Sequence, residues 1–77
     1  MKKGHTQRKE EEVIKLVGDN VRRIRISKNL TITELANMAE IEHAHLSRIE
    51  LGKINTTISM AWHLAKILGV KVTKLFE

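Results

Sequence analysis

Four side chains near the middle of the chain have the types and spacing of a face that could contact DNA bases. They are His43, Ala44, Ser47 and Arg48, which share one outward side if the segment forms a helix. The guanidinium of Arg48 can donate two hydrogen bonds to O6 and N7 of guanine, and the methyl group of Ala44 can contact a thymine methyl. A small polar face of this kind fits the DNA major groove.

Residues 31–52 supply the two short helices and the tight turn that would position this face. Apolar residues recur at helical spacing on the inner side of both helices, and Ile41 enters the turn between them. Those of the first helix are Leu35, Ala36 and Ala39, and those of the second are Leu46 and Ile49. The pattern predicts a helix-turn-helix, and therefore a DNA-binding protein.

An amphipathic helix is predicted before this unit, from about residue 10 to Lys28, because apolar residues recur there at helical spacing. Gly18 interrupts it, and either permits close packing against another helix or marks a later start at Asp19. Thr31 and Glu34 then form a capping box that begins the next helix.

Two helices are predicted nearer the C-terminus. Thr57 is a suitable N-cap for a helix over residues 58–68, which Gly69 ends, and a short helix follows over residues 73–77. The residues expected to face the core are Ile58, Ala61, Leu64, Ala65 and Leu68 from the longer helix and Leu75 and Phe76 from the shorter one.

Composition sets the class of the protein. Strong helix formers and the absence of proline favour an all-α fold, and 77 residues suffice for one small domain. We predict a compact five-helix domain over residues 10–77, preceded by a disordered basic tail at residues 1–9. No membrane-spanning apolar run or signal-peptide pattern is found, so we expect a soluble cytoplasmic protein at the nucleoid.

The net charge of +5 favours an acidic partner, with nucleic acid the commonest one. Basic residues dominate residues 13–30 and 53–77, whereas residues 31–52 are acidic. The acids of that segment are Glu34, Glu40, Glu42 and Glu50, against Arg48 alone. The flanking segments would therefore supply most of the attraction to phosphates.

No chemistry other than binding is indicated. His43 and His45 cannot chelate one ion together, because residues two apart on a helix point about 200° apart, and no cysteine is present. No acid pair, nucleophile–base set or glycine-rich phosphate loop is found. We expect no metal site, no cofactor and no enzymatic activity.

The chain resembles the Xre-type helix-turn-helix domain of phage repressors, restriction-modification controllers and small bacterial regulators. The resemblance covers residues 18–77 and implies a compact, lambda-repressor-like five-helix domain whose third helix lies in the major groove. The matching residues are Arg22-Arg23-Ile24-Arg25, Leu30-Thr31, Glu34-Leu35-Ala36, residues 46–52 and 64–70, and Leu75-Phe76.

The resemblance also implies a set of DNA contacts. Groove-facing residues are His43, Ala44, Ser47 and Arg48, although Ser47 could bond a phosphate and Arg48 could pair with Glu50 or Glu34 instead. Glu50 is expected to form a salt bridge with an arginine of the first helix. The implied phosphate contacts are Lys53, Asn55 and Thr57 after the third helix, Thr31 and Thr33 at the second, and Arg22 and Arg25 from the first.

Three positions depart from the family's usual residues. Ile32 replaces a glutamine that binds the DNA backbone, and Thr33 could take over that contact. Glu40 replaces a glycine in the turn, which costs about 1 kcal/mol or bends the turn differently. Glu42 replaces a serine or threonine N-cap, and its carboxylate repels phosphates unless it accepts from cytosine N4.

A homodimer is implied as well, because small free-standing members of the family dimerise through their fourth and fifth helices. The residues expected at the interface are Trp62, His63, Val72 and Phe76. Two recognition helices about 34 Å apart would match half-sites one DNA turn apart. We therefore expect a repressor or autoregulating controller bound to a pseudo-palindromic operator in double-stranded DNA.

A second interpretation is a protein-interaction module, an antitoxin or antirepressor whose main partner is a protein. The acidic balance of residues 31–52 and the missing glutamine favour it.

Overall fold

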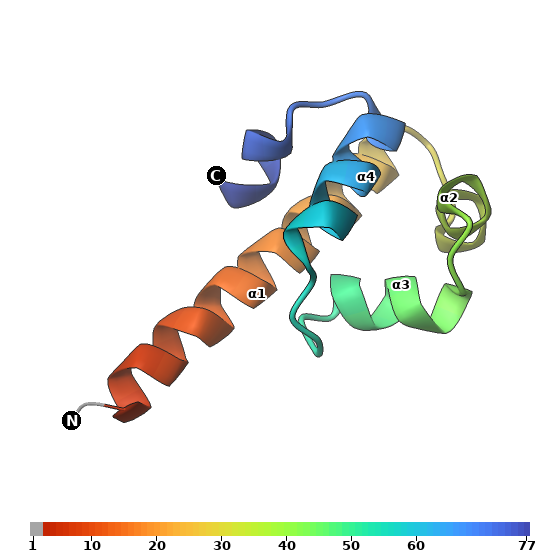
Figure 1. The fold of residues 1–77 in the computed structure, drawn as a ribbon. Helices are drawn as coiled ribbons and strands as arrows, with labels where there is room; N and C mark the ends of the chain where they lie inside the picture. The colour runs from red at the N-terminus through yellow and green to blue at the C-terminus, as the bar shows by residue number, and fades with distance from the viewer. Residues whose placement is uncertain (1–2) are drawn as a thin grey trace.

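The structure, a computed structural model, describes the backbone of residues 3–77 and the side chains from Lys9 onward. Its elements are α1 (Lys3–Ser27), α2 (Ile32–Ala39), α3 (His43–Glu50), α4 (Ile58–Leu68) and η1 (Val72–Phe76), as Figure 1 shows. No strand occurs in this part of the chain, so the predicted all-α fold is confirmed.

The fifth element is a 3-10 helix. It spans residues 72–76, one residue earlier than the short helix predicted over residues 73–77. The N–H of Lys74 donates to the carbonyl oxygen of Lys71, three residues earlier, at 2.9 Å. Hydrogen bonds of this tighter type are common in short helical segments.

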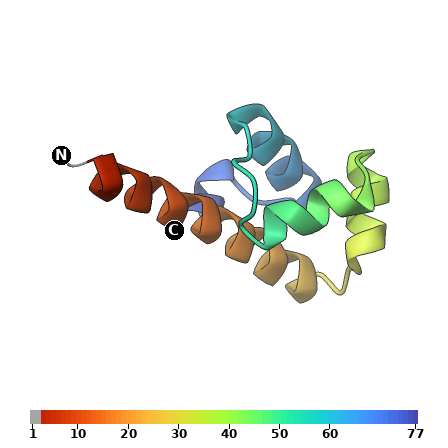
Figure 2. The same cartoon turned by 90° about the horizontal axis from the view of Figure 1, so that it is seen from below.

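α1 begins earlier than predicted. It starts at Lys3, not near residue 10, and its first turns extend away from the rest of the chain in both views (Figures 1 and 2). Residues 7–12 are Gln, Arg, Lys and three Glu, all good helix formers, so the polar composition that suggested a tail does not oppose a helix. Residues 3–9 of the predicted disordered tail are therefore helical, whereas Met1 and Lys2 lie outside the described residues.

Gly18 lies where α1 and α3 pack closely. The helix continues through it, and a Cβ atom built there would overlap the carbonyl oxygen of Ile49 and touch that of Glu50. Close helix packing, the first of the two interpretations of this glycine, is therefore correct. Since the neighbouring atoms belong to the backbone of α3, Gly18 sets how near α3 lies to α1.

The predicted caps of α2 and α4 are confirmed. Thr31 Oγ1 accepts from the Glu34 N–H at 3.0 Å, and the Glu34 carboxylate accepts from the Thr31 N–H at 2.8 Å. Thr57 accepts from the Met60 N–H at 3.0 Å, and Gly69 ends α4 with φ of 76°. Each of these contacts satisfies backbone groups that the helix itself leaves free.

Glu40 ends α2 in the left-handed conformation, with φ of 58° and ψ of 42°. The turn therefore keeps the backbone shape that glycine usually supplies, and does not bend differently. A side chain in this conformation costs about 1 kcal/mol.

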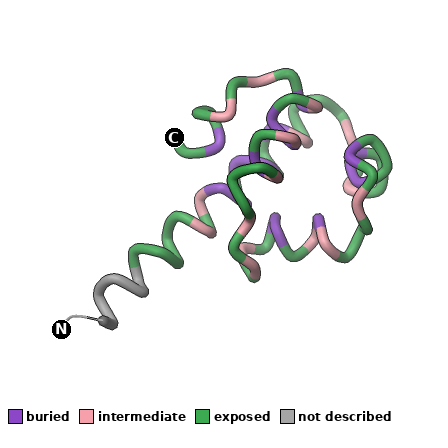
Figure 3. Tube along the Cα trace, viewed as in Figure 1, coloured by how far each residue is buried: buried purple, intermediate pink, exposed green. Residues whose placement is uncertain are grey.

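The core lies where α1, α2, α3, α4 and η1 meet, and Figure 3 shows the buried positions along the trace. All five inner residues predicted for α2 and α3 are buried, and Leu75 is fully enclosed. Two core predictions are wrong, because Ile58 is 81% exposed and Phe76 is 46% exposed. Ile58 opens the first turn of α4, where no other element covers it. The fully buried larger side chains are Val21, Leu35, Leu46, Ile49, Leu64 and Leu75.

A buried amide holds the C-terminal segment on α1. Asn20 Nδ2 donates to the carbonyl oxygen of Leu75 at 2.9 Å and to that of Glu77 at 3.3 Å. Its Oδ1 accepts from the Arg23 guanidinium at 3.1 Å. The side chain is thus satisfied on both sides, as a buried polar group requires. Sequence reasoning did not single out Asn20.

No helix in the described residues has the length and apolar character that crossing a bilayer requires.

Candidate nucleic-acid interface

The outer side of α3 carries all four residues predicted to contact bases. His43, Ala44 and Arg48 are exposed and Ser47 is half-buried, while Leu46 and Ile49 on the inner side are buried. Burial of Leu46 and Ile49 in the core holds α3 in place. The four residues thus form one outward face that begins at His43, the first residue of α3.

Arg25 and Glu50 form a buried ion pair beneath this face. Arg25 Nε lies 2.7 Å from one Glu50 carboxylate oxygen, and a terminal guanidinium nitrogen lies 2.9 Å from the other. The remaining terminal nitrogen donates to the Leu30 carbonyl oxygen at 2.8 Å. The side chains are only 11% and 4% exposed. The pair joins α1, α3 and the segment before α2.

The hydrogen bond from Arg25 to Glu50, and the attraction between their charges, raise the pKa of the guanidinium above its usual value although burial opposes the shift. The expected salt bridge of Glu50 is therefore confirmed, and its partner is Arg25. Three of the five guanidinium N–H groups of Arg25 are used by these bonds, and Arg25 lines the same hollow as Arg22 and Ser47. The predicted phosphate contact of Arg25 stays a prediction.

Arg48 has neither of its two alternative acidic partners. Glu50 bonds Arg25, and Glu34 bonds the backbone of Thr31. Within the described part of the chain, the Arg48 guanidinium forms no ion pair. Its donors are therefore available to an external acceptor.

Arg22, unlike Arg25, is exposed on α1. It lines an open hollow with Ile32 at the start of α2 and with Ser47 and Leu51 at the end of α3. The structure thus brings a cation of the first helix next to the predicted reading helix. Ile32, which replaces the family's glutamine, contributes only apolar surface there.

The other predicted phosphate contacts are exposed at two places. Thr31 and Thr33 lie at the start of α2, and Lys53, Asn55 and Thr57 lie in the loop between α3 and α4. The Thr31 and Thr57 hydroxyls already accept backbone N–H groups. Their own O–H groups remain as donors.

The four residues predicted for a dimer interface differ in exposure, since two are exposed and two are half-buried. Trp62 and Phe76 are 54% and 46% exposed, and the Lys66 ammonium lies 5.1 Å from the centre of the Trp62 ring. His63 and Val72 are half-buried. Nε2 of His63 lies 3.0 Å from the carbonyl oxygen of Ala39, so this ring joins α4 to the end of α2.

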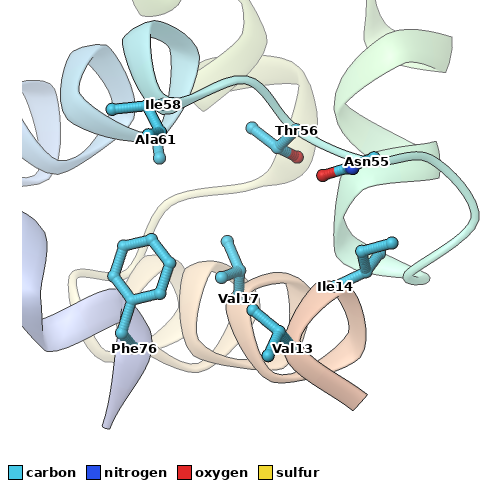
Figure 4. A pocket seen from close by; sticks show the side chains of 8 residues that line it. All are labelled: Val13, Ile14, Val17, Asn55, Thr56, Ile58, Ala61 and Phe76. Carbon is cyan, nitrogen blue, oxygen red and sulfur yellow. The ribbon is translucent and has the colours of Figure 1, made fainter. Parts of the chain in front are cut away.

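An apolar groove that sequence reasoning missed lies beside Phe76. Its volume is about 150 Å³, and Figure 4 shows Val13, Ile58 and Phe76 around it. Ile58 and Val13 are 81% and 48% exposed, so α1, α4 and η1 together present apolar side chains to solvent. Asn55, predicted as a phosphate contact, lies at the edge of the same groove. The groove was not predicted because Ile58 was expected to face the core.

No group of three or more His, Asp or Glu side chains that could hold a metal ion occurs among the described residues.

The sequence of this chain matches a known family model and a known bacterial protein. A family model described as helix-turn-helix matches residues 21–75. An uncharacterized HTH-type transcriptional regulator of Sinorhizobium fredii, y4dJ, is 38% identical over 61 residues, which are 79% of each chain.

Two solved structures share the arrangement of the helices. The restriction-modification controller protein C.AhdI of Aeromonas hydrophila superposes with a TM-score of 0.78 at 24% identity, over 82% of this chain and 96% of its own. The hypothetical transcription factor NHTF from Neisseria superposes with a TM-score of 0.82 at 25% identity, over 88% of this chain and 78% of its own.

Proposed function

Because the chain belongs to the Xre-type helix-turn-helix family of DNA-binding transcription regulators, we propose that it binds a pseudo-palindromic operator as a homodimer. It acts as a repressor or as an autoregulating controller, and works in the cytoplasm at the nucleoid. The observation that carries the proposal is the outward face of α3, which stays exposed while the inner face is buried.

In the proposed complex α3 lies in the major groove. Arg48 donates to O6 and N7 of a guanine, since no acid within the described residues pairs with it. His43 donates to a base or phosphate at the start of the helix, and Ala44 contacts a thymine methyl. Ser47, half-buried beside Arg22, suits a phosphate better than a base.

Phosphate contacts flank the reading helix in this proposal. Arg22 and Arg25 are the proposed contributions of α1, and Arg22 is the more accessible of the two, because Arg25 also pairs with Glu50. The other proposed contacts are Thr31, Thr33, Lys53, Asn55 and Thr57, all of them exposed. Their attraction to DNA falls steeply as salt is added, because binding releases counterions.

The proposed dimer uses the exposed apolar side chains of α4 and η1. Trp62 and Phe76 are kept from the sequence prediction. Ile58 is added because, at 81%, it is the most exposed large apolar residue in the described part of the chain. His63 and Val72 contribute less, since both are half-buried within the protein itself. Sedimentation that finds only monomer at high micromolar concentration would refute the dimer.

A second candidate function is a protein-interaction module of the antitoxin or antirepressor type. The apolar groove beside Ile58 and Phe76 favours it, because such a surface could receive another protein in place of a second copy.

The deciding experiment is a binding selection from randomised duplexes of about 30 base pairs at about 150 mM salt, followed by sequencing. Enrichment of a two-fold symmetric motif supports the dimeric regulator. A single short half-site indicates a monomeric reader. Weak, salt-sensitive binding without any enrichment would refute the sequence-specific regulator and favour the protein-interaction module.

A further inference from the structure

Glu42 directly precedes the proposed reading helix, and among residues 9–77 its side chain forms no ion pair and no capping hydrogen bond. Its backbone is extended, with φ of −70° and ψ of 145°, and it occupies the N-cap position of α3. Its carboxylate does not cap the helix, and the residue is exposed. Among residues 9–77 no ion pair involves it.

The other acids of the helix-turn-helix differ from Glu42. Glu50 pairs with Arg25, and Glu34 holds the backbone of Thr31. Glu40 is exposed without an ion pair as well, but it ends α2 in the turn. Glu42 alone combines a free carboxylate with a place at the N-terminal end of α3. In helix-turn-helix proteins the N-terminal residues of this helix contact base edges.

A carboxylate at this place can only accept hydrogen bonds. Phosphates repel it, so a favourable contact requires a donor on a base edge. In the major groove the donors are N4 of cytosine and N6 of adenine. Adenine presents the N7 acceptor beside its amino group, which repels a carboxylate, whereas cytosine presents no acceptor there. Cytosine is therefore the base that Glu42 can select.

We propose that the Glu42 carboxylate accepts a hydrogen bond from N4 of a cytosine and so selects C at one position of each half-site. This inference rests on the proposed function, since it requires α3 to lie in the major groove. It gives a specific role to a residue whose charge would otherwise only weaken binding to DNA.

The test is to repeat the binding selection with E42A, E42Q and the control E40Q beside the unaltered protein. E42A should reduce the preference for cytosine at one position about 5- to 150-fold, the range in which one mismatched base pair typically lowers affinity. E42Q should shift that preference toward adenine, because an amide can bond N6 and N7 together. E40Q removes an equal charge two residues away and should leave the motif unchanged.

The outcomes distinguish failure of this inference from failure of the proposed function. If the unaltered protein enriches a motif that E42A and E42Q leave intact, the reading role is overturned while the proposed function stands. The reading role is also overturned if E40Q changes the motif as E42A does, because charge alone would then explain both. If the unaltered protein enriches nothing, the proposed function fails and the inference fails with it. Since no hydrogen bond of the Glu42 side chain holds α3, both variants should keep the helix content of the unaltered protein by circular dichroism.

Discussion

Replacing Gly18 by alanine is expected to destabilise the domain, although the same change stabilises most helices. In an exposed helix interior, Gly→Ala gains about 1 kcal/mol. At position 18 the added Cβ would overlap the carbonyl oxygen of Ile49, so α3 must move away from α1. Overpacking of this kind typically costs about 1–3 kcal/mol, and about 3 kcal/mol is appropriate because the neighbour is backbone.

The balance of these two effects is a net loss of about 2 kcal/mol in the free energy of unfolding. Urea unfolding followed by helix circular dichroism, at one fixed protein concentration, measures it directly. The midpoint temperature should fall by about 8–16 °C for a domain of this size. Because α3 carries the proposed reading face, affinity for the proposed operator should fall as well.

Asp19→Ala is the matched control for this experiment. Asp19 is the next residue on α1, and its ion pair with Lys15, 3.3 Å long, is exposed. The lost pair and the gain in helix propensity should nearly cancel, so stability should change by less than about 0.5 kcal/mol. If Gly18→Ala unfolds at the same or a higher urea concentration than the unaltered protein, then α3 does not pack against Gly18 as closely as described. A smaller side chain at Ile49 should not rescue Gly18→Ala, since the overlap is with a carbonyl oxygen.

Three further predictions concern charge, recognition and assembly. Glu50→Ala should cost about 3 kcal/mol of unfolding free energy, because it leaves the Arg25 guanidinium buried without its partner, and an unchanged urea midpoint would contradict this. Arg48→Ala should lower affinity for the operator by about 1–3 kcal/mol and relax one base position, whereas Lys53→Ala should weaken binding to all sequences alike and flatten its salt dependence. Identical behaviour of those two variants on operator and random duplexes would disprove their assigned roles. Ile58→Asp should shift sedimentation toward monomer while the helix content stays the same, since Ile58 is 81% exposed and supports no core contact; a dimer that persists would move the interface elsewhere.

Local signals in the sequence predicted most of the fold. The capping box of Thr31 and Glu34, the N-cap Thr57 and the left-handed Gly69 all involve atoms a few residues apart, so sequence spacing suffices to find them. The inner residues of α2 and α3 were also predictable, because helical periodicity places them on one side.

Predictions failed where a contact depends on distant parts of the chain. Periodicity placed Ile58 and Phe76 in the core, but no element covers either side chain fully. Asn20 gave no signal, because its partners are backbone atoms of Leu75 and Glu77, at the opposite end of the domain's sequence. One further failure was local: the polar residues at the start of the chain suggested a tail, although several of them are good helix formers, and α1 begins at Lys3.

The sequence by itself determined the helix-turn-helix unit, its outward residues and its resemblance to a family, because helix periodicity and capping act within a few residues. Only the tertiary structure decided that Arg25 is the arginine that pairs with Glu50, and that Arg48 forms no ion pair among the described residues. It also decided that Gly18 is a packing contact, and that Ile58 faces solvent. These properties depend on which surfaces meet when the helices pack, and that depends on all of the helices at once.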